Sequence, residues 1–503
     1  MADRSISSPR ERRTSTTRMA AAGSATLSGA WSIVVIGASG DLAKKKTYPA
    51  LLKLYAGGLL PPHCNIVGTA RSKYTNEEFR VKLQPYLAKS GLGSDVIAAF
   101  SARLVYQPCG YTSTEDYATL AVMLDGLEHE FADAEAHRMF YLAIPPSVFV
   151  AASRSIKSAA MSSRGTTRVV IEKPFGRDLA SSEVLRAGLS ELFEEEQMFR
   201  IDHYLGKEMV QNLLMMRFAN SIFEPLWNRE HIETVSITFK EDIGTQGRGG
   251  YFDNIGIIRD VMQNHLMQIM SIVAMDTPVS LDSEDIRDEK VRVLRCTRPI
   301  ALDDVVLGQY TASTDGAEPG YLDDASIENK DSTTPTFAQA ALWIDNARWS
   351  GVPFILKCGK ALNERKAEIR IQFKDKVPAL FKNVYRNELV MRVQPDMAIY
   401  MKTNMKKPGL SHETTMGELD MTYSEAFADA YLPGQSVDIC LFLPLFLSSL
   451  SLSFLSLFFK SLSLSLSPRP RVHEIAPHPP CLPPLLFVLP SSLLSPLLPR
   501  RRV

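Results

Sequence analysis

The chain has 503 residues, and its 56 lysines and arginines balance 56 aspartates and glutamates. This length is enough for two or three domains with separate hydrophobic cores. Because the net charge is zero, nothing points to nucleic acid or an anionic membrane as the main partner. The cysteines lack CxxC or Cys/His metal spacing, which favours reduced thiols over disulfides or a structural zinc; they occupy positions 64, 109, 296, 358, 440 and 481.

The first 30 residues are rich in Ser, Thr, Ala and Arg and contain only two acids, Asp3 and Glu11. Organellar transit peptides and ordinary disordered tails share this composition. We expect a disordered leader over residues 1–30 and a cytoplasmic protein. A plastid or another organelle is the alternative if the leader is a transit peptide.

Residues 31–200 alternate short apolar runs with helical patterns. The runs at 32–36, 66–69, 139–144 and 169–171 predict strands, and residues 49–55 predict a helix. This rhythm is typical of βαβ units on a parallel sheet.

A glycine turn between the first strand and its helix predicts an anion site. Glycine permits the tight turn, and free backbone N–H groups at the helix start can face a pyrophosphate. The candidate residues are Gly37, Ala38, Ser39, Gly40, Asp41, Leu42 and Lys44. Arg71 lies just after the second strand and could pair with a 2′-phosphate, so NADP is favoured over NAD. The Gly-x-x-Gly spacing also fits a plain βα turn, and Arg71 also fits a solvated surface residue.

Two short stretches after predicted strands carry polar chemistry. One is residues 172–176, and the other, 200–208, holds Asp202, His203, Tyr204 and Lys207. Together these groups could donate to a phosphate and supply a carboxylate that orients a base. A solvated charged loop is the other interpretation.

The sequence pattern changes after residue 232, from continuous apolar runs to alternating ones. Strand-like runs at 234–239, 340–344, 369–373 and 390–393 alternate inward and outward residues, which predicts an antiparallel sheet in an α+β domain over 201–438. A helix beginning near residue 256 has one apolar face, formed by Ile258, Val261, Met262, His265, Ile269 and Val273. His265 is therefore expected to be at least partly buried. Such a histidine fits a core residue, but desolvation also keeps it neutral, as a general base must be.

Read together, GASGDLAK at 37–44, EKPFG at 172–176, RIDHYLGKE at 200–208 and RDVMQNH at 259–265 resemble glucose-6-phosphate dehydrogenase. The similarity continues through residues 247–252, 320–324 and 354–366 and fades after Tyr431, covering about four-fifths of the chain. The resemblance implies a Rossmann-type dinucleotide-binding domain over 31–200, followed by the α+β domain with its large, mainly antiparallel sheet.

The family oxidises the C1 hydroxyl of D-glucose 6-phosphate to 6-phospho-D-glucono-1,5-lactone and passes hydride to NADP, the first step of the oxidative pentose phosphate pathway. By resemblance, His265 is the base and Asp202 orients it, with no metal. The resemblance implies that the substrate pocket consists of Lys173, His203, Tyr204, Lys207, Glu241, Asp260, Lys360, Arg365 and Gln394. Lys173 and the residues of the glycine loop, with Arg71, would bind the cofactor. Phe149 stands where some members have Tyr.

Some members hold a second, structural NADP. Its matching positions here are Lys357, Lys366, Arg370, Arg392, Tyr400 and Lys402. Lys357 replaces an arginine and cannot form a bidentate fork. A homodimer or tetramer is expected from the family.

The tail from about residue 432 is foreign to the family pattern. Residues 439–459 carry no charge, which meets the length criterion for a membrane anchor, but the Leu, Ser, Phe and Pro bias better fits a translated non-coding stretch that does not fold. We expect residues 439–503 to be a low-complexity tail, and an impaired isoform or an NADP-binding non-enzyme is the alternative function. Another sugar oxidoreductase with a Glu-Lys-Pro loop is the same-class alternative.

Overall fold

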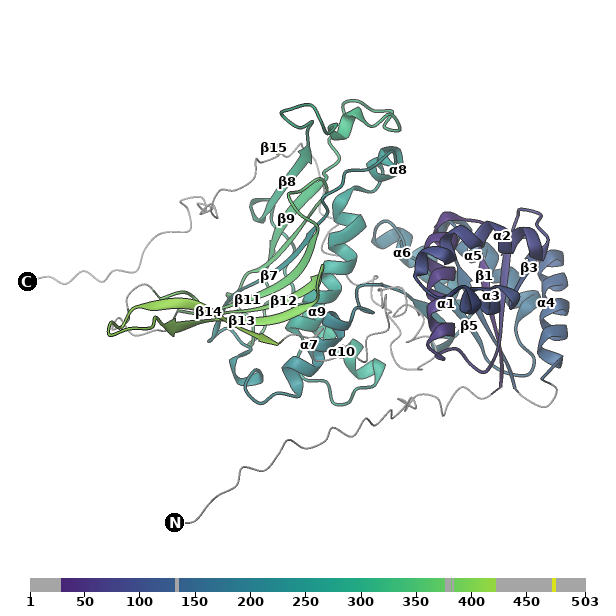
Figure 1. The fold of residues 1–503 in the computed structure, drawn as a ribbon, viewed down its shortest axis with the longest axis horizontal. Coiled ribbons are helices and arrows are strands. Elements are labelled where there is room, and N and C mark those ends of the chain that lie inside the picture. Colours follow the sequence, from purple (N-terminus) through teal and green to yellow (C-terminus); the bar gives the residue numbers. More distant parts are fainter. Residues whose placement is uncertain (1–28, 132–134, 376–380, 382–383, 422–472, 476–503) are drawn as a thin grey trace, which may run out of the picture.

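The computed structural model describes residues 29–131, 135–375, 381, 384–421 and 473–475 (Figure 1). Nearly all of the expected leader lies outside these ranges, as do the apolar run 439–459 and Cys440 and Cys481 of the tail. In the described part the four cysteines are unpaired. No helix in the described ranges is both long and apolar enough to cross a membrane.

The first sheet is parallel and six-stranded, in the order β3-β2-β1-β4-β5-β6. Its strands are β1 (Ala30–Ile36), β2 (His63–Ala70), β3 (Leu104–Pro108), β4 (Ala136–Leu142), β5 (Thr167–Ile171) and β6 (Met198–Arg200). The predicted parallel sheet is thereby confirmed. The run predicted as 139–144 begins earlier and ends at Leu142.

Helices cover both faces of this sheet, which explains why β1 is buried along its whole length. Ile33 and Val35 face the core formed with α1 (Tyr48–Ala56), α2 (Asn76–Leu87) and α3 (Ser94–Ala102). Val34 and Ile36 face the opposite core, formed with α4 (Thr114–His129), α5 (Phe149–Ser155) and α6 (Leu179–Ser190). The alternation of the strand therefore divides one apolar run between two cores.

The second sheet has nine strands in the order β14-β13-β12-β11-β7-β10-β9-β8-β15. They are β7 (Ile232–Lys240), β8 (Val305–Tyr310), β9 (Phe337–Leu342), β10 (Phe354–Gly359), β11 (Lys366–Phe373), β12 (Glu388–Gln394), β13 (Ala398–Lys406), β14 (Thr414–Met421) and β15 (His473–Ile475). Among the strands of this sheet that the structure describes, only the β7–β10 and β8–β15 pairs are parallel. The prediction of a large, mainly antiparallel sheet is confirmed.

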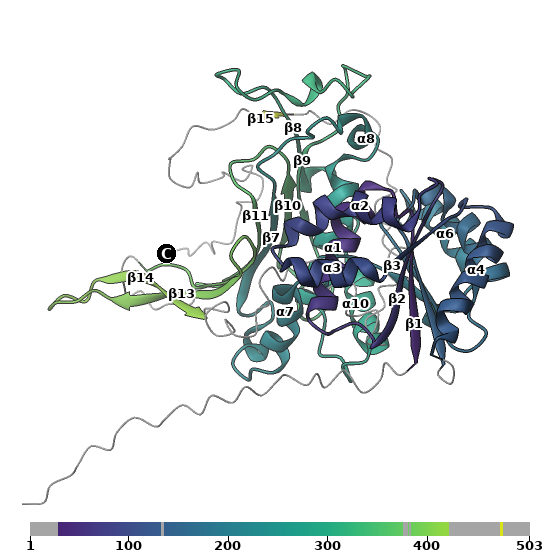
Figure 2. The ribbon, with the colours of Figure 1, turned by 45° about the vertical axis from the view of Figure 1, so that its right-hand side comes forward.

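A helical layer lies between this sheet and the first domain (Figure 1). It contains α7 (Glu208–Phe218), a π-helix (Ile258–Leu266), α9 (Met267–Ala274) and α10 (Ser283–Cys296), and the short α8 (Gly249–Asp253) lies near one end of the sheet. Apolar side chains of these helices and of the inward sheet face form one core. The turned view shows the β13–β14 hairpin extending away from the rest of the sheet (Figure 2).

Candidate active site

His265 lies on the predicted helix, but residues 258–266 are π-helical and not α-helical. At about 100° per residue, an α-helix would turn positions 260 and 265 about 140° apart. Bonding from i to i+5 brings such positions nearly above one another. The π-helix therefore turns Asp260 and His265 toward the same side, and the apolar positions after it continue into α9.

His265 forms a dyad with Asp202. Its Nδ1 lies 2.9 Å from both carboxylate oxygens of Asp202, which follows β6 at the end of the first sheet. The His265 side chain is 3% exposed, and that of Asp202 is 9% exposed. Burial lowers the pKa of His265 against the opposing pull of Asp202. Burial would raise the pKa of Asp202, but the charge and hydrogen bond of His265 hold it well below its usual range.

Aromatic rings fix the orientation of the His265 imidazole. The ring centroids of His203 and Tyr204 lie 4.3 and 4.7 Å from that of His265. Both belong to the polar stretch 200–208, whose backbone turns when Tyr204 N donates to Asp202 Oδ1. The solvated-loop interpretation of this stretch is therefore wrong, because Asp202, Tyr204 and Lys207 are largely buried.

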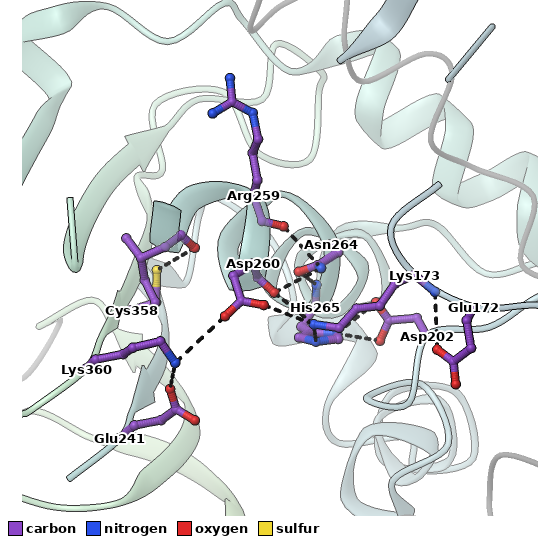
Figure 3. A network of polar contacts seen from close by, with 11 residues as sticks. Glu172, Lys173, Asp202, Glu241, Arg259, Asp260, Asn264, His265, Cys358 and Lys360 are labelled. Carbon is purple, nitrogen blue, oxygen red and sulfur yellow. Dashed lines mark hydrogen bonds and ion pairs between the residues drawn. The ribbon is translucent and has the colours of Figure 1, made fainter. Parts of the chain in front are cut away.

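Lys173 joins the two domains at this site. Its Nζ lies 3.3 Å from His265 Nε2 and 3.2 Å from Asp260 Oδ1 (Figure 3). If the ammonium donates to Nε2, the imidazole proton is on Nδ1 and is shared with Asp202. The lone pair of Nε2 then points toward the Lys173 ammonium.

A second pair of charges lies across from the dyad. Lys360 Nζ contacts Glu241 Oε2 and is 3.8 Å from Asp260 Oδ2. Lys207 Nζ donates to Gln394 Oε1 at 2.7 Å and lies 4.7 Å from the Tyr204 ring centroid. Apart from Arg365, an exposed side chain, the predicted pocket residues are linked through these contacts and those of the dyad.

The glycine turn after β1 has a backbone that a side chain would block. Gly37 has φ +91°, and a Cβ there would lie 2.2 Å from the carbonyl oxygen of Ala143. Gly40 N donates to Gly37 O, and the helical run begins directly afterwards. Ser39 Oγ and Ser72 Oγ are 3.3 Å apart, so the residue after Arg71 contacts this loop. The Arg71 guanidinium is exposed and lies 5.1 Å from the Tyr111 ring centroid.

The six candidates for a second cofactor site share one face of the large sheet. Residues that pair across neighbouring strands point to the same face of a sheet. Lys357 and Glu368 both pair with Thr238, and Glu368 pairs with Arg392. The remaining candidates lie on this face in neighbouring rows of paired residues. Two carboxylates on this face form ion pairs with the candidates: Glu368 bonds Lys366 and Arg370, and Glu388 contacts Arg370 and Lys402. The charges of these candidates are thus partly neutralised within the sheet.

Two polar residues next to the dyad had no role in the sequence predictions. Asn264 accepts from His265 N at 2.7 Å and donates to the Asp260 carbonyl at 3.0 Å, so it bridges the π-helical turn. Glu172 is hydrogen-bonded by the Tyr141 hydroxyl, and burial raises its pKa. Both belong to the family motifs at 172–176 and 259–265, and this membership is the signal in the sequence that could have identified them. They line a cavity of about 30 Å³ next to Asp202, which is enough for one water molecule.

Comparison with known proteins agrees with this geometry. Residues 34–212 match the family model described as glucose-6-phosphate dehydrogenase, NAD binding domain, and residues 214–434 match the corresponding C-terminal domain. The chain is 52% identical to glucose-6-phosphate 1-dehydrogenase of Takifugu rubripes over 80% of this chain and 76% of the relative. It is also 52% identical to that of Dictyostelium discoideum, covering 80% of each chain.

Solved structures of glucose-6-phosphate dehydrogenases are also similar to this chain. A structure described as glucose-6-phosphate dehydrogenase in complex with its substrate glucose-6-phosphate superposes with a TM-score of 0.83 at 44% identity, covering 90% of this chain and 96% of that one. Glucose-6-phosphate 1-dehydrogenase from Mycobacterium avium superposes with a TM-score of 0.75 at 29% identity, covering 89% and 94%. Chloroplastic enzymes are among the relatives. The chain therefore belongs to the glucose-6-phosphate dehydrogenase family and is an NADP-dependent oxidoreductase of the pentose phosphate pathway.

Proposed function

We propose that His265 is the base that accepts the C1 hydroxyl proton of D-glucose 6-phosphate. The observation that carries this assignment is the bond from His265 Nδ1 to the buried Asp202, which leaves Nε2 as the basic atom. Removal of the proton allows the C1–O bond to become the lactone carbonyl as the C1–H electron pair leaves as hydride. NADP, when bound, supplies the nicotinamide carbon that accepts this hydride.

The surroundings of the dyad suit both states of the base. Burial and the Lys173 ammonium lower the pKa of His265, so the imidazole is neutral when substrate arrives. Once it takes the proton, the Asp202 carboxylate stabilises the imidazolium. Asp202 is held ready for this role because its own pKa stays well below the working pH.

We propose that the substrate phosphate and hydroxyl groups bind among the predicted pocket residues. Lys173 and Lys207 supply ammonium groups, and His203, whose pKa is lowered mainly by burial, supplies a neutral ring. A dianionic phosphate needs several such donors. Lys360 contacts both Glu241 and Asp260 opposite the dyad, and these three side chains fit sugar hydroxyls. Tyr204, Arg365 and Gln394 complete the proposed pocket.

We propose that the loop from Gly37 to Lys44 holds the pyrophosphate of the catalytic NADP and that Arg71 pairs with its 2′-phosphate. A side chain at position 37 would collide with Ala143, so the backbone is kept open for a close ligand. A second, structural NADP on the sheet face with Lys366 and Arg370 is a separate proposal. It predicts that alanine at both positions reduces the rise in Tm on adding NADP without changing KM for NADP.

The test of the base is His265→Asn, measured by NADPH formation and by binding of glucose 6-phosphate. Turnover should fall by at least about a thousandfold while substrate Kd changes little, because a transition-state role is lost and a phosphate contact is not. His129→Asn, on an exposed end of α4, is the matched control and should behave like the wild type. Turnover of His265→Asn within tenfold of the wild type would show that another group takes the proton.

By family expectation, we also propose a cytoplasmic homodimer or tetramer. Sedimentation of the purified chain and microscopy of a tagged one test the two parts of this proposal.

A further inference from the structure

The connection between β8 and β9 contains a segment, residues 320–336, that supplies none of the proposed pocket residues. Its first five residues, 320–324, belong to the family pattern. We name residues 320–336 the brace. The brace lies at the end of the second sheet near α8 (Figure 1). It is bonded to two sides of the proposed substrate pocket, namely the wall that holds Lys360 and Glu241 and the wall that holds Asp260 and His265.

Asp324 is the main attachment of the brace to the loop that follows Glu241. Its Oδ2 accepts hydrogen bonds from Thr245 Oγ1 at 2.6 Å and from the amides of Gly247 and Gly249, each at 3.1 Å. Its Oδ1 accepts from the amide and hydroxyl of Ser326. Desolvation opposes ionisation, but these bonds, those of Ser326 and Thr245 foremost, hold the pKa of Asp324 well below its usual range. The carboxylate is thus fully used as an acceptor.

Glycine at positions 249 and 250 allows the brace to approach this closely. A Cβ on Gly249 would lie 2.5 Å from Ile327 Cγ1, and one on Gly250 would lie 2.3 Å from the Ser326 carbonyl oxygen. Gly250 N also donates to Ser326 Oγ at 3.0 Å. The loop and the brace are therefore packed backbone to backbone.

Both ends of the brace bond the segment that leads into the π-helix. Tyr321 Oη donates to Asp253 Oδ1 at 2.8 Å, and Thr334 Oγ1 donates to the Asp253 carbonyl at 2.8 Å. Ile257 N, at the start of the π-helix, donates to Pro335 O at 3.1 Å. The brace thereby fixes the turn from which Asp260 and His265 project.

The brace also reaches the Lys360 wall through the backbone. Lys360 N donates to Thr336 O at 3.0 Å, and Leu362 N donates to Glu241 O at 2.8 Å. Lys360 and Glu241 are thus tied to each other and to the brace. One segment is bonded to both sides of the pocket.

We propose that the brace sets the separation between the Lys360–Glu241 wall and the Asp260–His265 wall, with Asp324 as the positioning residue for substrate binding. This inference depends on the proposed function, since it needs Lys360 to contact the sugar. Asparagine at position 324 keeps the shape of the side chain, but its NH2 group replaces one of the two acceptor oxygens. That NH2 group would then meet hydrogen-bond donors, either those of Thr245, Gly247 and Gly249 or those of Ser326. The loop would then shift and move Glu241 and Lys360 away from the sugar.

The experiment compares Asp324→Asn with Asp323→Asn, the same change one residue earlier at an exposed carboxylate. Within the described ranges, the Asp323 side chain accepts from Gly320 N alone. Asp324→Asn should raise KM for glucose 6-phosphate about tenfold, as expected for lost charge-assisted hydrogen bonds, with KM for NADP within about twofold of wild type. Asp323→Asn should change neither. Thr245→Val removes one donor to Asp324 and should give a smaller rise in KM for glucose 6-phosphate. This variant tests the inference even if Asp324→Asn folds poorly.

Lys360→Ala and the double variant separate this inference from the pocket assignment. If the brace acts through Lys360, adding Asp324→Asn to Lys360→Ala should raise KM for glucose 6-phosphate little further. A full additive rise, or equal losses of affinity for both substrates, would overturn the inference and leave the pocket assignment intact. An unchanged KM in Lys360→Ala alone would instead overturn the assignment of Lys360 to the pocket.

Discussion

Replacing Asp202 with asparagine tests the electrostatic half of the dyad. Asparagine keeps the size of the side chain and an oxygen that can accept from Tyr204 N and from His265 Nδ1, which both bond Oδ1 in the structure. The negative charge is lost, and an NH2 group takes the place of Oδ2, which also lies 2.9 Å from Nδ1. The neutral imidazole keeps its bond to Oδ1, whereas the imidazolium formed during the reaction loses its counterion.

The size of the effect follows from the short distance between the two groups. With 2.9 Å between Nδ1 and the carboxylate oxygens, the charge centres are about 4 Å apart, and at an effective dielectric constant of about 20 their interaction is about 4 kcal/mol. At about 1.4 kcal/mol for each factor of ten, kcat should fall by about a thousandfold. KM for glucose 6-phosphate should change much less, since the ground state does not contain the imidazolium.

The assay is steady-state NADPH formation with glucose 6-phosphate carrying hydrogen or deuterium at C1. The variant should show a larger isotope effect on kcat than the wild type, because bond breaking at C1 becomes the slow step. A kcat within tenfold of wild type would refute the electrostatic account. A large loss with no isotope effect would place the defect in binding or release and refute it equally.

Lys173→Met removes the cation that lowers the pKa of His265, so the folded pKa of the base should rise. Activity requires the neutral imidazole and is lost as pH falls through that pKa. The acid limb of kcat/KM, expected below pH 6.5 in the wild type, should therefore move to higher pH in the variant. An acid limb that stays in place or moves to lower pH would contradict the contact with Lys173. Arg71→Ser should raise KM for NADP at least about tenfold and leave the weaker use of NAD nearly unchanged, as loss of a guanidinium–phosphate pair predicts. Equal changes for both cofactors would show that Arg71 does not read the 2′-phosphate.

The first domain was largely predictable because its signals are local. A continuous apolar run such as β1, followed by glycines and a helix, is what a doubly covered parallel strand requires. The alternation in β7 likewise predicts a sheet with one buried face. The three-residue strand β6 has too little sequence for a periodic signal, and it follows from pairing with β5.

The site was less predictable, because its geometry depends on pairings across long stretches of chain. Lys173 and His265 are 92 residues apart, and no local pattern indicates that their side chains meet. The pairing of His265 with Asp202 came from family resemblance. The π-helix could not be distinguished from an α-helix over nine residues, since the buried positions fit both, yet it decides which side chains face the pocket.

The contact of Lys173 with Asp260 and His265 makes the chemistry depend on how the two domains meet. Lys173 follows β5 of the dinucleotide domain, whereas Asp260 and His265 belong to the π-helix of the other domain. The same ammonium lowers the pKa of the base and belongs to the proposed phosphate site. Any change that separates the domains should therefore weaken substrate binding and raise the pKa of the base together. A change within one domain that leaves the Lys173 contacts with Asp260 and His265 in place should not alter the two together.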